Sequence, residues 1–229
     1  MSFQVIYEDN HLLAVNKPAG VLVQGDQTGD ITLMDMAKEY IKVRYNKPGD
    51  VFLGCIHRLD RPVSGVVIFA RTSKALSRMN QLFQDRQVQK TYFAISGSRP
   101  DPLMGEIEDY LKKDKEKNIT KRYPNPKKRP SDAKQSLLSY EMLGEIGSHH
   151  LLKVHPQTGR PHQIRVQLMG IGCPIKGDLK YGADKPEQGG NIYLHCYELS
   201  FIHPVKKENI TIKAMPAKDQ IWKLFYHLF

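Results

Sequence analysis

Short stretches rich in β-branched, aromatic and other apolar residues recur along the chain, some alternating with polar residues and some continuously apolar, and both patterns are typical of β-strands. The stretches lie at 3–7, 12–15, 21–23, 66–70, 90–95, 137–143, 150–154, 192–195, 198–202 and 210–214. Most of them are separated by short polar turns or by turns that contain Gly or Pro, which are common between strands. The pattern therefore predicts a protein in which strands predominate.

Three other segments have apolar residues three or four positions apart, which is the spacing of an amphipathic helix. One begins after Thr32, which can cap a helix together with Asp35. A second follows Ser73 as its cap, and a third begins near Pro161, a favoured first-turn residue, and ends around 170–172. Strands outnumber helices and several are joined by short turns, so we expect an α+β fold with a mixed, mainly antiparallel sheet and flanking helices.

The length of 229 residues suits one domain of generous size or two small ones, and 40% apolar residues suffice for a core. No apolar run is long enough to span a bilayer, and the first residues lack the pattern of a signal peptide. Cys55, Cys173 and Cys196 are far apart and form no CxxC pair, so neither a disulfide framework nor a zinc ribbon is indicated. We expect a cytoplasmic protein without a membrane partner.

The net charge of +10 is concentrated in one segment. Residues 112–129 contain nine Lys or Arg, among them Lys127, Lys128 and Arg129, and two acids, which gives a net charge of +7. A local basic patch is suited to a phosphate backbone, although a solvated Lys-rich hairpin would have the same composition. Three prolines between 124 and 130 argue against a continuous helix here.

The segment His57–Gly65 carries an acid, Asp60, with Arg58 and Arg61 close on either side, and it leads into the apolar run 66–70. Neighbouring cations favour an ionised carboxylate, as a nucleophile or a base requires. The alternative is an ordinary salt bridge in a loop, because structural ion pairs produce the same pattern. Taken alone, the segment does not decide between the two.

Two further groups of residues are candidates for chemistry. In 158–165, His162 and Arg165 are three positions apart and would share a helix face, and Arg165 could bind a carboxylate or a phosphate through two hydrogen bonds. In 90–92, strand alternation places Lys90 and Tyr92 on one face, where Tyr92 could stack on a base or assist proton transfer. Alternatively, Arg165 has only a structural role, and Tyr92 is an aromatic residue of a sheet core.

Motifs for metals and nucleotide cofactors are missing from the sequence. The nine histidines are not accompanied by HExxH, by paired carboxylates or by Cys ligands. Walker A, Rossmann and GxSxG patterns are also absent. We therefore expect no cofactor and no metal.

Taken together, the motifs resemble those of the RluA family of RNA pseudouridine synthases. Residues 57–65 match HRLDxxTSG with Val63 in place of Thr, 90–94 match KxYxA, and 158–168 match TGRxHQIRxHL with Gln167 in place of the second His. Further matches, in the family's order, lie at 16–20, 174–178, 181–182 and 194–195. The resemblance extends from about Val5 to Pro216.

The resemblance implies a pseudouridine synthase fold with a central catalytic cleft, and a role for each matched residue. Asp60 would be the catalytic aspartate, Tyr92 the active-site tyrosine, and Arg165 the arginine that pairs with Asp60. Arg58 would occupy space near the flipped base, and Leu194 would line the base pocket. The implied reaction isomerises uridine to pseudouridine in RNA.

The same resemblance sets expectations for partners. The substrate would be a stem-loop of ribosomal or transfer RNA, which Arg61, His162, Lys127, Lys128 and Arg129 would help to bind. The catalytic pattern begins within the first few residues, so an N-terminal S4 domain is expected to be absent. We expect a monomer with a single catalytic domain over 1–229. A silent RNA-binding module and a hydrolase with an Asp nucleophile are the rival functions.

Overall fold

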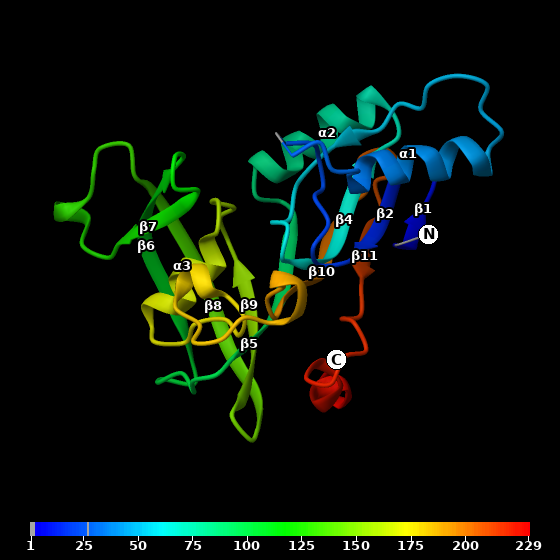
Figure 1. Ribbon diagram of the computed structural model, residues 1–229. Coiled ribbons are helices and arrows are strands. Elements are labelled where there is room, and N and C mark those ends of the chain that lie inside the picture. Colours follow the sequence, from blue (N-terminus) through cyan, green and yellow to red (C-terminus); the bar gives the residue numbers. More distant parts are fainter. Residues whose placement is uncertain (1–2, 27) are drawn as a thin grey trace. The chain divides into compact units, whose positions relative to one another are not determined.

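The computed structural model describes residues 3–26 and 28–229, and contacts within the chain divide it into two compact units (Figure 1). The first unit runs to Gln89 and includes Cys196–Pro216. The second unit comprises Lys90–His195 and Ala217–Phe229. That 1–229 acts as one catalytic domain stays a prediction.

The first unit contains a sheet in which β1, β2, β4 and β10 are neighbours in that order, while β3 pairs with β4 and β11 pairs with β10. The strands are β1 (Gln4–Glu8), β2 (Leu12–Lys17), β3 (Gly54–Cys55), β4 (Ser64–Ala70), β10 (Leu194–Ile202, nearly all in this unit) and β11 (Asn209–Lys213). The pairs β1–β2, β2–β4, β3–β4 and β10–β11 are antiparallel. Strands β2 and β4 are almost wholly buried and form the centre of this core.

The described residues of the first unit include the helices α1 (Leu33–Arg44) and α2 (Ser73–Gln84). As predicted, Thr32 and Asp35 form a capping box: the Thr32 hydroxyl accepts a hydrogen bond from Asp35 N (3.2 Å), and the Asp35 carboxylate accepts one from Thr32 N (3.0 Å). Thr72 caps α2, so the prediction of Ser73 was wrong by one residue. Both hydroxyl residues suit this position equally, and the sequence alone does not separate them.

The segment 21–23 was predicted as a strand and is not one. The carbonyls of Leu22 and Val23 instead accept hydrogen bonds from the backbone N–H groups of Leu33 (2.8 Å) and Met34 (3.2 Å). A helix leaves its first N–H groups without intrahelical partners, so these carbonyls satisfy the start of α1 rather than a neighbouring strand.

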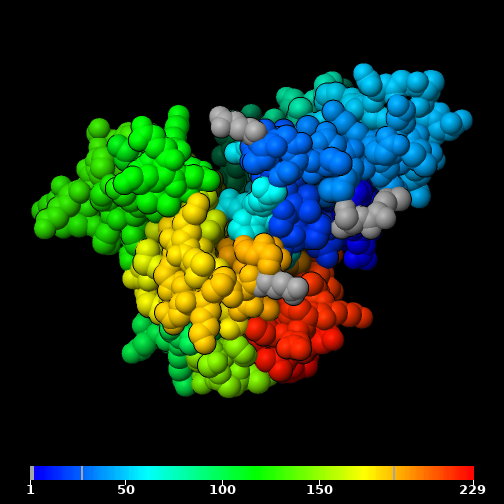
Figure 2. All heavy atoms as spheres, viewed as in Figure 1, coloured from blue at the N-terminus to red at the C-terminus, as the bar shows by residue number. Residues whose placement is uncertain are grey.

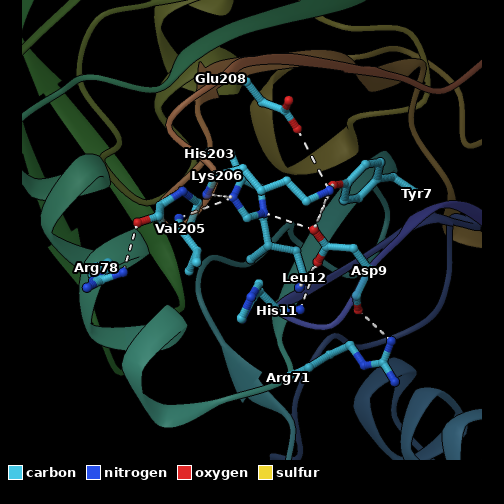
Figure 3. Close-up of polar contacts among 11 residues, drawn as sticks. Tyr7, Asp9, His11, Leu12, Arg71, Arg78, His203, Val205, Lys206 and Glu208 are labelled. Carbon is cyan, nitrogen blue, oxygen red and sulfur yellow. Dashed lines mark hydrogen bonds and ion pairs between the residues drawn. The ribbon is translucent and has the colours of Figure 1, made fainter.

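The turn between β1 and β2 is tied to the segment that follows β10 (Figure 3). Asp9 accepts hydrogen bonds from the backbone N–H groups of His11 and Leu12, both at 2.8 Å. Its other carboxylate oxygen lies 3.1 Å from Nε2 of His203 and 3.1 Å from Nζ of Lys206. One carboxylate therefore joins the β1–β2 turn to the segment between β10 and β11.

The second unit contains five strands in the order β5-β9-β8-β6-β7, and each neighbouring pair is antiparallel. The strands are β5 (Gln89–Ser96, all but its first residue in this unit), β6 (Met104–Asp114), β7 (Ile119–Tyr123), β8 (Lys134–Ile146) and β9 (His149–Pro156). The helix α3 (Gln163–Gly170), predicted near these bounds, packs against β6 and β7. Short 3₁₀ segments lie at Pro126–Lys128, Leu179–Tyr181, Gln188–Gly190 and Trp222–Leu228.

The basic segment is not a continuous helix, as predicted, but much of it is the hairpin of β6 and β7. The sequence did not reveal β6 because a fully buried acid, Asp109, interrupts its apolar face. The predicted strands 192–195 and 198–202 also differ from the structure, because half of the first and all of the second lie within the single strand β10. No helix in the described residues is long and apolar enough to cross a membrane.

Candidate active site

Asp60 lies in the loop that leads into β4 and is half-buried. Its carbonyl accepts a hydrogen bond from Val63 N at 3.0 Å, which closes a tight turn over Arg61 and Pro62. The pattern of residues 57–65 predicted this arrangement of a loop followed by a buried strand. The turn fixes the backbone of the candidate nucleophile.

At Gly65 the backbone of β10 approaches so closely that there is no space for a side chain. Its φ of +120° is in the region that favours glycine, and an added Cβ would lie 2.2 Å from the carbonyl oxygen of Cys196 on β10. No L side chain fits without moving β10. This close approach fixes the start of β4, which begins three residues after Arg61.

His57 holds the start of the same loop. Its Nε2 accepts a hydrogen bond from the backbone N–H of Ile68 (3.1 Å), and its ring stacks on Phe83 of α2 with centroids 5.0 Å apart. A ring nitrogen that accepts carries no hydrogen, so the proton of the neutral ring is on Nδ1. His57 thus connects the Asp60 loop to β4 and α2.

Lys17, at the end of β2, is completely buried beneath the Asp60 loop. Its ammonium donates to the carbonyls of Pro18 (3.0 Å), Val21 (2.6 Å) and Arg61 (3.1 Å). An ammonium has three N–H donors, and all three are matched. The carbonyl of Arg61 also accepts from Gly20 N at 2.8 Å, so Lys17 and the 16–20 segment hold the residue that follows Asp60.

The charges of Lys17 and Asp60 interact with each other. Burial lowers the pKa of Lys17 to about 7, the negative charge of Asp60 opposes this by raising it, and the positive charge of Arg61 adds to the lowering. The 16–20 segment matches the family pattern, but the sequence alone gives Lys17 no role. The available signal was a lysine at the end of a strongly apolar strand.

The two arginines beside Asp60 differ in their surroundings. Arg58 is exposed. Arg61 is also exposed, and it forms an ion pair with Asp30 and donates from Nε to the carbonyl of Gly20 (3.1 Å). The predicted cations are therefore not equivalent, because Arg61 is bound to the loop that precedes α1.

In the second unit, Tyr92 lies on β5 opposite Val154 of β9 and is half-buried. Lys90 is also half-buried and donates to the carbonyl of Thr158 (3.4 Å). Thr91, between them, is buried, which confirms the predicted alternation. Leu194, the first residue of β10, is buried as well.

Arg165 on α3 forms a two-point ion pair with Asp178. Its Nε lies 2.7 Å from Oδ2 and its Nη2 lies 2.8 Å from Oδ1, and both side chains are more than nine-tenths buried. The sequence predicted a bidentate contact of Arg165 with a carboxylate or phosphate, but it did not identify Asp178. Asp178 lies in the matched segment 174–178, which was the available signal.

His162 immediately precedes α3 and adopts a left-handed conformation, with φ of +53°. It is buried, and its Nδ1 lies 2.7 Å from the hydroxyl of Tyr181. The Arg165 guanidinium lies 5.0 Å from the centre of the same ring. His162 and Arg165 therefore both contact Tyr181, and the surroundings of His162 are those of a supporting residue.

The basic segment separates into cations used inside the fold and cations directed to solvent. Arg122 binds the buried Asp109 through two nitrogens and donates to Gly170 O at 2.6 Å. Arg129 lies over the Tyr110 ring (4.2 Å) and donates to Ala133 O (3.2 Å). The exposed cations are Lys113, Lys115, Lys117, Lys121, Lys127 and Lys128.

Figure 2 shows this part of the second unit, in green, at the molecular surface. The composition of residues 112–129 therefore overstates the charge available to a partner, because Arg122 is already paired with Asp109. The six exposed lysines keep most of the positive charge.

The two departures from the family motifs occupy buried positions. Val63 is 3% exposed. Gln167 is fully buried and donates from Nε2 to the carbonyl of Ile107 at 3.0 Å, which joins α3 to β6. Neither residue faces solvent, so both contribute to packing inside the fold.

Solved structures identify the class of fold. The human RNA pseudouridylate synthase domain containing 4 protein aligns with 96% of this chain and 91% of its own, with a TM-score of 0.78 at 24% identity. The human domain containing 1 protein aligns with 94% of this chain and 83% of its own, with a TM-score of 0.70 at 24% identity. The predicted α+β pseudouridine synthase fold is confirmed.

Sequence comparison identifies the family. The family model for RNA pseudouridylate synthase matches residues 11–169. A tRNA pseudouridine synthase C from Pectobacterium carotovorum subsp. carotovorum is 34% identical over 92% of this chain and 58% of its own length. The one from Haemophilus influenzae is 32% identical over 99% of this chain and 97% of its own.

The chain belongs to the RNA pseudouridylate synthase family, and the resemblance to its RluA branch is confirmed. Several relatives are longer. The chain spans 58% of the length of the Pectobacterium protein. It also spans 60% of the length of a ribosomal large subunit pseudouridine synthase D from Borreliella burgdorferi, and 85% of this chain aligns with that protein at 34% identity.

Proposed function

We propose that this protein isomerises uridine to pseudouridine within structured ribosomal or transfer RNA. The observation that carries the proposal is the family match over 11–169, because this one segment contains Asp60, Tyr92 and Arg165. The relatives named above act on transfer RNA in two cases and on the large ribosomal subunit in the third, by their names. Both kinds of RNA remain candidates for this chain.

The reaction breaks the N1–C1′ bond, rotates the detached uracil and joins C5 to C1′. Atoms are rearranged and nothing is oxidised, so the reaction itself consumes no cofactor. A stacked base cannot enter an active site, and flipping it out costs a few kcal/mol, least in a loop. A stem-loop substrate is therefore favoured over a continuous duplex.

Asp60 is the proposed catalytic aspartate. It attacks C1′ to form a covalent adduct, or it assists elimination to a glycal-type intermediate, and either route requires the ionised carboxylate. Two cations are proposed to favour that form: Lys17, which lies beneath the loop, and Arg165, which the family pattern pairs with Asp60.

The remaining roles follow the family pattern. Tyr92 stacks on the uracil and helps to move the C5 proton, Leu194 lines the base pocket, and Arg58 occupies space near the flipped base. The exposure of Arg58 and the burial of Leu194 are consistent with these roles.

The basic segment is the proposed contact with the phosphate backbone, and its exposed lysines make that contact. Arg61 and His162 were grouped with it from the sequence, but their engagement with Asp30 and Tyr181 supports a structural contribution. We propose a cytoplasmic protein that acts as a monomer, since a stem-loop can be bound by a single chain.

A tritium-release assay separates this function from its two rivals. The protein is incubated with 5-tritiated uridine in transcribed ribosomal and transfer RNA, and tritium in water and free uracil are measured. Release of tritium with pseudouridine in the digest supports the proposal. Free uracil would indicate a hydrolase, and RNA binding with neither product would indicate a silent binding module; either result would overturn it.

A further inference from the structure

Arg165 is held by a carboxylate that sequence reasoning did not assign. The Asp178 oxygens contact Nε and Nη2 at 2.7 and 2.8 Å, and Asp178 is 1% exposed. Two parallel hydrogen bonds on one edge of a planar guanidinium fix its plane and not merely its position. The direction of Nη1, which is outside this pair, is fixed with the plane.

A ring completes the support of the guanidinium. Tyr181 lies below Arg165, with 5.0 Å between the guanidinium carbon and the ring centre. The Tyr181 hydroxyl accepts a hydrogen bond from Thr120 N (2.7 Å) and contacts Nδ1 of His162 (2.7 Å). Tyr181 is itself immobilised between β7 and the start of α3, so the guanidinium is restrained at its edge and on its face.

The turn that carries Asp178 is attached to the strand that carries Tyr92. Lys176 N donates to Ile95 O on β5 (2.8 Å), and Tyr193 N donates to Lys176 O (3.0 Å). Gly177 makes the turn possible, because its φ is +83° and an added Cβ would lie 2.6 Å from the carbonyl of Asn191. The turn that carries Asp178 therefore links Arg165 to the backbone of β5.

We propose that Asp178 is a positioning residue for Arg165, which it orients toward the reacting uridine. This proposal rests on the proposed function. Asp178 offsets part of the charge of Arg165, and it adds a fixed direction for the hydrogen-bond donors of the guanidinium that lie outside the ion pair. Because the buried carboxylate already holds the guanidinium in its orientation, no free energy is needed to reorient it during the reaction.

The test is a double-mutant cycle of Asp178→Asn and Arg165→Lys, with tritium release as the activity. Asparagine keeps the size of the side chain but has only one acceptor oxygen, so the two-point contact that holds Nε and Nη2 is lost. We expect kcat to fall on the order of 10- to 100-fold, with KM changed by less than about threefold, because misorientation affects the chemical step. Glu145→Gln, in an exposed ion pair of the same unit, is the control and should keep full activity.

The cycle distinguishes positioning from general structural support. If Asp178 acts through Arg165, Asp178→Asn has little further effect in the Arg165→Lys background, as expected for residues that act as one unit. The same fold loss in both backgrounds, or unchanged kcat in Asp178→Asn, would overturn the proposal. If Asp178→Asn does not fold, the cycle is repeated with Asp178→Glu, which keeps the charge and displaces it.

A second readout does not depend on activity. In ¹⁵N NMR spectra, the Nε–H of Arg165 should exchange slowly with water in the wild type, and at least about tenfold faster in Asp178→Asn. Unchanged exchange would refute positioning even if activity fell. A slowly exchanging Nε–H in a wild-type protein that releases no tritium would refute the proposed function and leave the positioning intact.

Discussion

Lys17 in the first unit and Arg165 in the second are both buried cations, but the protein stabilises them in different ways. Lys17 is surrounded by three backbone carbonyls, whereas Arg165 is paired with the full charge of Asp178. Carbonyl dipoles compensate a buried charge only partly, so the pKa of Lys17 falls to about 7. A guanidinium keeps its charge in proteins, so Arg165 stays a cation at any physiological pH.

The contrast has a functional meaning. The first unit fixes the loop of Asp60 through backbone contacts. The ammonium of Lys17 donates to the carbonyl of Arg61, and the backbone of Gly65 packs against that of Cys196. The second unit fixes its candidate arginine through side chains. Substitutions should therefore have different consequences in the two units, and the following predictions test that difference.

The largest effect is expected from removing the acid of the buried pair. Asp178→Ala leaves an unpaired guanidinium in the interior and should lower the free energy of unfolding by about 3–5 kcal/mol. Lys17→Met removes the buried charge itself and leaves three carbonyls without a donor, so the loss should be about 1–3 kcal/mol. Urea unfolding measures both, and Arg99→Gln in an exposed ion pair, expected within about 1 kcal/mol, is the control. Equal losses for Asp178→Ala and Arg99→Gln would contradict the comparison.

Two glycines offer the same contrast on a smaller scale. An added Cβ at Gly65 meets the backbone of Cys196, whereas at Gly144 it would lie 2.9 Å from Cδ1 of Leu228, the end of a side chain. A strand cannot move aside, but the end of a leucine side chain can, so Gly65→Ala should cost about 2–4 kcal/mol and Gly144→Ala about 1–2 kcal/mol. Thermal unfolding provides the measurement, with Gly97→Ala, which meets no atom within 4 Å, as the control. A reversed order would show that the approach of β10 to Gly65 is adjustable.

The pH dependence of stability should also separate the two cations. Because the pKa of Lys17 is about 7 in the folded protein and near 10.5 when unfolded, the unfolded chain binds more protons between these values. The wild type should therefore gain stability relative to Lys17→Met as pH rises from 7 to 10, by at most about 1.4 kcal/mol per pH unit. Urea midpoints of both proteins at matched pH provide the test. A difference that stays constant over this range would mean that Lys17 does not titrate there.

The smallest expected effect concerns the exposed lysines of the second unit. Replacing Lys127 and Lys128 with Gln should weaken RNA binding and reduce its salt slope by about 0.7–0.9 for each phosphate that these lysines neutralise in the wild type. The control is the replacement of Lys218 and Lys223, two exposed lysines elsewhere in the same unit. Arg129 is better left in place, because it also packs on Tyr110. An unchanged slope would favour the alternative of a solvated hairpin.

The sequence predicted those parts of the fold in which local preferences agree with the final structure. The capping box of Thr32 and Asp35 and the helix that follows Pro161 are examples. The prediction failed at 21–23, where backbone carbonyls serve the start of α1 rather than a sheet, and at β6, where a buried Asp109 interrupts the apolar face. Both failures arise from tertiary contacts that periodicity does not contain.

The candidate site shows the same limit. Motif order predicted Asp60, Tyr92 and Arg165, and these roles stay predictions. Lys17 and Asp178 were matched only as parts of motifs, because a buried lysine and a buried acid cannot be told from exposed ones by composition. Their roles depend on partners 44 and 13 residues away, Arg61 and Arg165, which only the folded chain brings into contact.

The central claim is that Asp60 carries out the isomerisation of uridine. Tritium release from 5-tritiated uridine RNA by purified Asp60→Asn, beside the wild type and the exposed control Asp50→Asn, tests it most directly. The account predicts no measurable release by Asp60→Asn, full release by Asp50→Asn, and RNA binding by all three proteins within a fewfold of one another. Full pseudouridine formation by Asp60→Asn would contradict it.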